Sequence, residues 1–122
     1  MVNTEHRLEQ RELDLAEALS RLDGDSNLLA ELARLFLEET PSHLLRLRGA
    51  VEERNCRTIE SVAHSLKGNV SNFGAKLAYE YAFALEKKGR ETDMAGVDEV
   101  FSALDQAFER CLRELEELLL KD

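Results

Sequence analysis

Residues 59–75 read IESVAHSLKGNVSNFGA, and the spacing of their apolar side chains predicts an α-helix. At about 100° per residue, the apolar residues of this stretch share one face of the helix. They are Ile59, Val62, Ala63, Leu66, Val70 and Phe73. His64 points about 140° away from the centre of that face, so its imidazole is expected to be exposed rather than part of the core.

Small and polar residues accompany His64 on the exposed face. Lys67 lies about one turn away on the flank, Ser71 lies beside the histidine, and Gly68 lies almost opposite the core. Glycine in a helix interior costs about 0.8–1.0 kcal/mol relative to alanine, and folding does not require a missing side chain on an exposed face. We therefore interpret Gly68 as clearance for a partner. An ordinary solvated lysine is the alternative for Lys67.

The chemistry of an exposed histidine indicates what this face does. Imidazole is a nitrogen nucleophile whose neutral form is well populated near pH 7, so His64 can attack phosphorus and carry a phosphoryl group. Lys67 could offset the negative charge of that group. Glu60, one turn before His64, could hydrogen-bond one ring nitrogen and leave the other to react. A solvated i,i+4 pair is the alternative for Glu60 and His64.

A longer pattern surrounds these residues: His64-x-Leu66-Lys67-Gly68, followed by Gly74-Ala75, Ala78, Ala82 and Leu85-Glu86. This pattern resembles the signature of histidine-containing phosphotransfer (HPt) domains, and the resemblance extends to residues 36–41 and covers about residues 12–120. It implies that His64 accepts phosphate from a receiver aspartate and passes it to another, that Lys67 stabilises the phosphate, and that Gly68 gives clearance to the receiver. The chain departs from the usual pattern at Asn55, Asn69, Leu77 and Phe83.

Composition places the chain among single, helical, soluble domains. It has 122 residues, of which 43% are hydrophobic and 34% charged, with one proline. The net charge of −9 argues against nucleic acid and anionic membranes as partners. The charge is uneven, since residues 64–90 carry +3 through Lys67, Lys76, Lys87, Lys88 and Arg90 against Glu80 and Glu86. A cationic face would complement the acidic phosphorylation pocket of a receiver, although charged helix faces are also common.

Other features exclude further classes of site. Cys56 and Cys111 lack metal-ligand spacing and are interpreted as reduced thiols. The polar N-terminus is no signal peptide, and no apolar run approaches the ~18 residues of a membrane span, which predicts a cytoplasmic protein without membrane insertion. We find no glycine-rich phosphate loop, so no nucleotide, metal or other cofactor is expected. Magnesium would be held by the receiver.

Turn and cap residues divide the chain into helices. Residues 1–11, including His6, are expected to form a flexible tail before a single domain at 12–121. A short first helix, marked by Leu15, Leu19 and Leu22, is expected to end at Gly24. Further helices are expected from 26 to about 51, from 56 to about 72, from about 76 to 88 with an end at Gly89, and from about 94 to 120. Asp25 and Asn55 are the expected N-caps. The pair Thr40-Pro41 either restarts a helix or kinks a continuous one.

These elements predict an all-α fold, an antiparallel up-down-up-down four-helix bundle with a short extra N-terminal helix. The expected partners are receiver domains of response regulators or hybrid histidine kinases. The expected docking residues are Gly68, Ser71, Glu60, Tyr79 and Phe83. Tyr79 and Phe83 lie one turn apart, as an exposed aromatic pair that docks a partner or as residues covered by the first helix.

The predicted activity is that of a monomeric phosphocarrier without ATP-dependent kinase activity of its own. One alternative is the phosphoacceptor domain of a chemotaxis-type histidine kinase, which an ATP-bearing domain phosphorylates directly. A second is a non-catalytic adaptor or oligomerisation bundle in which His64 is incidental. A third, a di-iron type bundle, lacks its Glu-x-x-His pairs.

Overall fold

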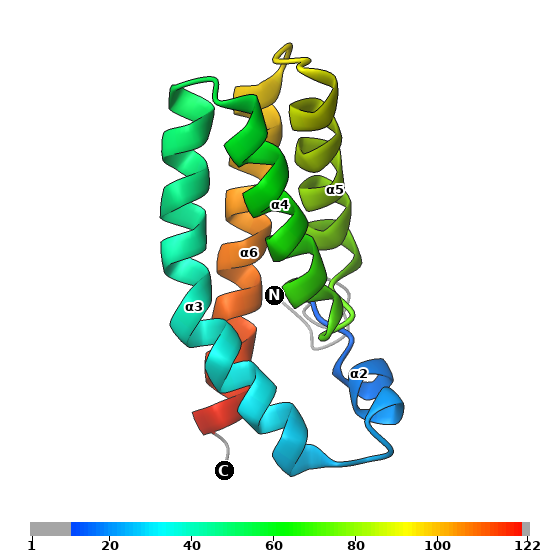
Figure 1. The fold of residues 1–122 in the computed structure, drawn as a ribbon. Coiled ribbons are helices and arrows are strands. Elements are labelled where there is room, and N and C mark those ends of the chain that lie inside the picture. Colours follow the sequence, from blue (N-terminus) through cyan, green and yellow to red (C-terminus); the bar gives the residue numbers. More distant parts are fainter. Residues whose placement is uncertain (1–10, 121–122) are drawn as a thin grey trace, which may run out of the picture.

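The computed structural model describes residues 11–120, and within them it consists of α-helices joined by short turns (Figure 1). The helices are α2 (Leu15–Arg21), α3 (Ser26–Glu52), α4 (Cys56–Ser71), α5 (Lys76–Glu91) and α6 (Val97–Leu120). Each of the four long helices packs against the next, and α6 returns to α3, which closes the bundle. The predicted four-helix bundle with a short extra N-terminal helix is confirmed. Most of the predicted tail, with His6, lies outside the described residues.

Side-chain caps begin two of the long helices where the sequence predicts. The Asp25 side chain accepts a hydrogen bond from the Leu28 amide (3.0 Å), and the Asn55 side chain accepts one from the Thr58 amide (3.2 Å). Each bond satisfies one of the amides that the first turn of a helix leaves without a partner. Asn55 therefore fixes where α4 starts, and with it the position of His64 along the bundle.

Helix α3 runs through Pro41 without a break, so the continuous, kinked form is the one that the structure has. Figure 1 shows the helix bending in its middle part. Proline lacks the amide that would bond to the Leu37 carbonyl, and this missing bond explains the bend. Thr40, the expected cap of a restarted helix, is instead fully buried inside α3.

The expected end of α5 at Gly89 is wrong. The helix continues to Glu91, and Thr92 takes the left-handed conformation (φ 51°) that ends it. Gly89 is buried, and a Cβ atom there would lie 2.6 Å from the Cys56 carbonyl oxygen and 2.7 Å from the Glu60 nitrogen. The glycine thus serves close packing of α5 on the start of α4 rather than chain reversal. Helix α6 likewise begins at Val97, later than the predicted residue 94.

The core confirms the apolar face from which the analysis of α4 started. All six of its residues are buried, together with the inward faces of α3, α5 and α6. Phe36 is packed edge-on against Phe73 and stacked with Phe108, with ring centroids 5.3 and 6.2 Å apart. This packing fixes the rotation of α4 about its axis, so His64 is held on the outside. No helix within residues 11–120 has the length and apolar character needed to cross a membrane.

Candidate functional site

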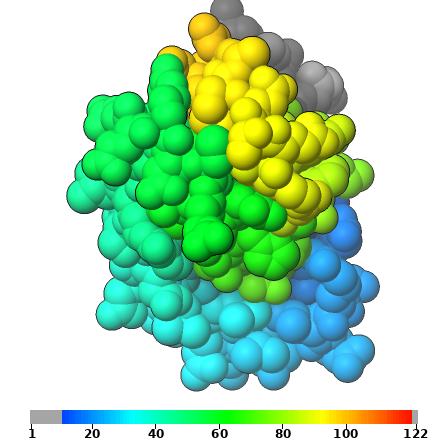
Figure 2. Space-filling view, turned by 45° about the horizontal axis from the view of Figure 1, so that its top comes forward, coloured from blue at the N-terminus to red at the C-terminus, as the bar shows by residue number. Residues whose placement is uncertain are grey.

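His64 lies in the middle of α4 on an open face of the bundle, and its side chain is 67% exposed. Helix α5 runs antiparallel to α4 and brings Glu86 beside it, so that the His64 Nδ1 atom lies 2.8 Å from Glu86 Oε2. In Figure 2 the green atoms of α4 lie between the cyan atoms of α3 and the yellow atoms of α5. Glu86 therefore holds the Nδ1 atom of the ring, and the Nε2 atom takes no part in this contact.

The Glu86 side chain is only 5% exposed and gathers the charged groups of the site. Besides His64, Lys67 Nζ lies 2.7 Å from Oε1, and Arg90 Nη2 lies 3.1 Å from Oε2. Burial on its own raises the pKa of the Glu86 carboxyl, but the contacts with Lys67 and His64 outweigh it and hold the pKa below its usual value. Glu86 is thus ionised at neutral pH and can only accept hydrogen bonds, so the proton of the shared bond belongs to His64 Nδ1.

Lys67 is more enclosed than the solvated lysine considered as an alternative. Its side chain is 18% exposed, and its ammonium lies between Glu86 and two aromatic rings. The Nζ atom is 5.0 Å from the centroid of Phe83 and 5.9 Å from that of Tyr79, distances at which a ring face attracts a cation. Tyr79 and Phe83 remain 39% and 46% exposed. The aromatic pair is therefore both a support for Lys67 and part of the surface beside the histidine.

The hypothesis that Glu60 hydrogen-bonds His64 is wrong, because the structure gives both residues other partners. Glu60 Oε2 accepts a hydrogen bond from Arg90 Nε at 3.2 Å, while Glu86 occupies His64 Nδ1. Arg90 follows Glu86 by one turn of α5 and so reaches both carboxylates. Glu60 belongs to the site through Arg90 and not through the imidazole.

Gly68 and Ser71 continue the exposed face beyond His64. A Cβ atom added to Gly68 would meet no neighbouring atom within 4 Å, so packing does not require a glycine there. The Ser71 hydroxyl donates to the Gly68 carbonyl (2.7 Å), and the Ser71 carbonyl accepts from Arg21 Nη2 (2.8 Å). The serine therefore completes the end of its own helix, and the surface around Gly68 stays low and open.

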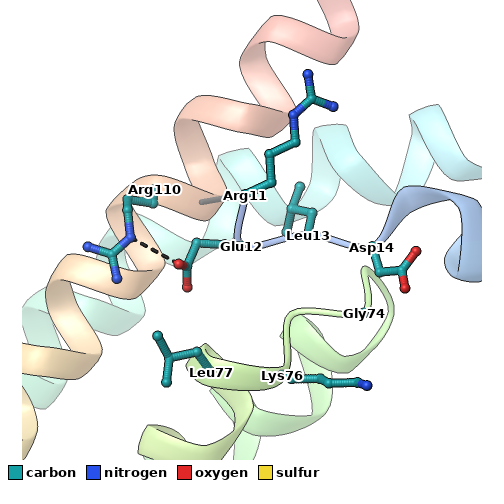
Figure 3. Close-up of a pocket in the computed structure, with 8 residues that line it drawn as sticks. All are labelled: Arg11, Glu12, Leu13, Asp14, Gly74, Lys76, Leu77 and Arg110. Carbon is teal, nitrogen blue, oxygen red and sulfur yellow. Dashed lines mark hydrogen bonds and ion pairs between the residues drawn. The ribbon is translucent and has the colours of Figure 1, made fainter. Parts of the chain in front are cut away.

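The histidine face is not a cavity. A pocket of about 730 Å³ lies elsewhere, where the start of the described chain crosses α5 and α6 (Figure 3). It is lined by Arg11, Glu12, Leu13, Asp14, Gly74, Lys76, Leu77 and Arg110, and its Glu12 carboxylate pairs with Arg110 at 3.1 Å. Neither His64 nor its partners line it. Within residues 11–120 no group of three or more His, Cys, Asp or Glu side chains is placed to hold a metal ion.

Glu86 and Arg90 are the residues whose part in the site the sequence analysis missed. Glu86 was noted only as a member of the longer pattern and as one of the acidic residues of the 64–90 segment, yet it lies next to Leu85 at the border of the buried face of α5. A carboxylate at such a border needs a partner, because burying an unpaired charge is costly. A basic residue one turn later, Arg90, was the sequence signal that could have identified a charged pair.

Comparisons with known proteins identify the family and the fold. The family model described as "Hpt domain" matches residues 31–118. Among solved structures, the chain is similar to the crystal structure of histidine-containing phosphotransfer protein B (HptB) from Pseudomonas aeruginosa PAO1. The TM-score is 0.83 at 20% identity, over 93% of this chain and 98% of that one, a likeness that concerns the fold. A comparison with curated proteins finds no matching sequence.

Proposed function

This chain belongs to the Hpt domain family, and from that premise we propose that it relays phosphoryl groups between receiver-domain aspartates through a phosphohistidine at His64. The observation that carries the proposal is the exposed imidazole whose Nδ1 atom bonds to the buried, ionised Glu86. With the proton on Nδ1, the lone pair of the neutral ring is on Nε2, the nitrogen left free for reaction. A nucleophile held at one atom and exposed at the other suits transfer from a large partner.

The transfer step follows from this geometry. The Nε2 lone pair attacks the phosphorus of an aspartyl phosphate in line with the leaving aspartate oxygen. A nitrogen–phosphorus bond forms, the phosphorus–oxygen bond breaks, and the aspartate leaves as a carboxylate. The ring gains positive charge, which Glu86 offsets across the 2.8 Å bond to Nδ1. The reverse step returns the phosphoryl group to another aspartate.

Lys67 is the proposed phosphate-stabilising residue, and its present contacts define how it acts. Its ammonium is paired with Glu86 Oε1 and lies one turn from His64. Shifting toward a phosphoryl group on Nε2 would weaken that pair, while Arg90 stays on Glu86 Oε2 and keeps the carboxylate partnered. Replacing Lys67 with alanine should therefore slow transfer by about tenfold or more, the value of one charge-assisted hydrogen bond. Binding of an unphosphorylated receiver should be retained.

Receiver docking is proposed to use the surface around the histidine. Gly68 leaves open space beside it, and Tyr79 and Phe83 offer exposed apolar area next to Lys67. Ser71 and Glu60 contribute to this surface through their bonds to Gly68 and Arg90. The positive charge of residues 64–90 would attract the acidic rim of a receiver phosphorylation pocket.

Phosphate transfer from a receiver tests the proposal. A receiver charged with acetyl phosphate should give the protein an acid-labile, base-stable phosphoryl group. His64→Gln should abolish this group, whereas His43→Gln and His6→Gln should not. Because the His64 side chain is largely exposed, its replacement should change stability by no more than about 0.5 kcal/mol, so a loss of labelling would not reflect unfolding. Labelling that persists in the His64 variant would overturn the assignment.

A further inference from the structure

Helix α2 is short, with seven residues, and covers only a small part of the bundle. It buries only Ala18, and it lies beyond the turn that joins α4 and α5 (Figure 1). Polar bonds hold it there, since the Asp14 amide donates to the Phe73 carbonyl (3.0 Å) and Arg21 donates to the Ser71 carbonyl (2.8 Å). Leu15 and Leu19 also pack, partly buried, against the core, so α2 is a small part of the core that is tied to the end of the helix carrying His64.

A groove of about 290 Å³ separates α2 from the start of α5. Its lining residues are Glu17, Arg21, Ser71, Gly74, Ala75, Lys76, Tyr79 and Glu80. The exposed ring of Tyr79 also lies 5.9 Å from Lys67 Nζ, and four of the lining residues are charged. The groove thus has apolar and charged lining residues, and Tyr79 belongs both to it and to the aromatic pair beside the histidine.

The groove lies within reach of any domain seated on His64. Ser71, at its edge, follows His64 by two turns of α4, which at 1.5 Å per residue is about 10.5 Å. A standard protein interface covers about 800 Å² on each partner, a patch with a radius of about 16 Å. The path between them passes Gly68, where no side chain projects. In Figure 2 the blue atoms of α2 lie at the lower right of the face centred on α4.

The charge of this side of the bundle indicates the chemistry of the occupant. Arg21 and Lys76 line the groove, Lys67 and Arg90 lie at the histidine site, and Glu86 is buried against three partners of its own. Lys76 is exposed and forms no ion pair within residues 11–120, so its charge is available to a partner. Glu17 and Glu80 also line the groove as opposing charges, and Glu17 pairs with Arg21 at 3.8 Å, which leaves Lys76 as the lining cation without an ion pair in the described part of the chain. A partner that presents an apolar side chain next to a carboxylate fits Tyr79 and Lys76 together.

We infer that the groove between α2 and α5 is a second contact of the receiver interface, which takes an apolar side chain of the receiver with a neighbouring carboxylate. The inference rests on the proposed function, because it takes the occupant to be the receiver that is seated on His64. It assigns to α2 the task of forming one wall of this contact, and to Lys76 that of favouring receivers with an acidic residue beside it, while Glu80 opposes such a residue.

Opposite charge reversals in the groove test the inference. Lys76→Glu places an acid in the first turn of α5, where the helix dipole favours it, so the variant should fold. Lys76→Glu should raise the KM for transfer from a phosphorylated receiver by about threefold to tenfold, with little change in kcat. Glu80→Lys should lower this KM. Arg34→Glu, an exposed reversal on α3 with the same change in net charge as Lys76→Glu, is the matched control and should have a much smaller effect.

Binding of the unphosphorylated receiver, measured by titration calorimetry with the same variants, separates this inference from the proposed function. Binding that Lys76→Glu weakens and Arg34→Glu does not would support the groove contact, even where His64 accepts no phosphate and the proposed relay fails. Equal binding of the wild type and both groove variants would overturn the inference, as would an equal loss in Arg34→Glu or the absence of receiver binding. Transfer that continues unchanged in all variants would overturn the inference and leave the relay intact.

Discussion

Replacing Glu86 with glutamine removes one negative charge from the centre of the site and keeps the shape of the side chain. The amide oxygen can still accept the hydrogen bond from His64, but the Lys67 ammonium, 18% exposed and 2.7 Å from Oε1, loses its counter-ion. Removing one partner of a fully buried pair costs about 3–5 kcal/mol, and an exposed pair such as that with Arg90 contributes about 0–1 kcal/mol. Since Lys67 can turn toward solvent, we expect a loss of about 1–3 kcal/mol at pH 7.

The pH dependence of this loss gives the prediction its sign. The pKa of Glu86 is lower in the folded protein than in the unfolded chain, where it has its usual value near 4.5. The stability that its charge contributes is therefore fully present above pH 4.5 and is lost as the pH falls through the lowered value. Urea unfolding of the wild type and the Glu86→Gln variant should differ most at neutral pH, and the two curves should converge in acid. Equal stability at pH 7, or a difference that does not shrink in acid, would refute the role assigned to Glu86.

The remaining predictions concern glycines and thiols. Gly68→Gln should keep or slightly raise stability but slow transfer at least tenfold, whereas Gly49→Gln, also helical with open space around its Cβ, should leave transfer unchanged; equal rates for both variants would remove the clearance argument. Gly89→Ala should destabilise by about 1–3 kcal/mol in urea unfolding, because its Cβ would meet backbone. Burial raises the pKa of the Cys111 thiol, so mass spectrometry after alkylation should find Cys56 modified first.

Local patterns in the sequence were sufficient to predict the fold. The apolar periodicity of α4 places His64 outside, and the caps at Asp25 and Asn55 mark helix starts, because each of these effects acts within about one turn of the chain. The end of α5 was predicted wrongly because Gly89 serves a contact with Glu60, 29 positions earlier, that no local pattern contains.

The site was predictable only in part, for the same reason. Exposure of His64 follows from its own helix, but its bond to Glu86 depends on the register between two antiparallel helices. Glu60, the nearer carboxylate in sequence, was the hypothesis, with a solvated pair as its alternative, because an i,i+4 pair can be derived from one helix alone. A glycine on an open helix face is also not a specific signal by itself. Gly49 has the same open surroundings as Gly68, and nothing in the structure explains why position 49 is a glycine.

Nitrogen-15 NMR of histidine-labelled protein that a receiver has phosphorylated tests the central claim most directly. Glu86 holds Nδ1 of His64 and leaves Nε2 free, so the account predicts a single phosphoryl group on His64 Nε2, with Nδ1 still carrying its proton. The His43 resonances, from a histidine half-buried in α3, should not change. A phosphoryl group on Nδ1, or on a histidine other than His64, would contradict the account.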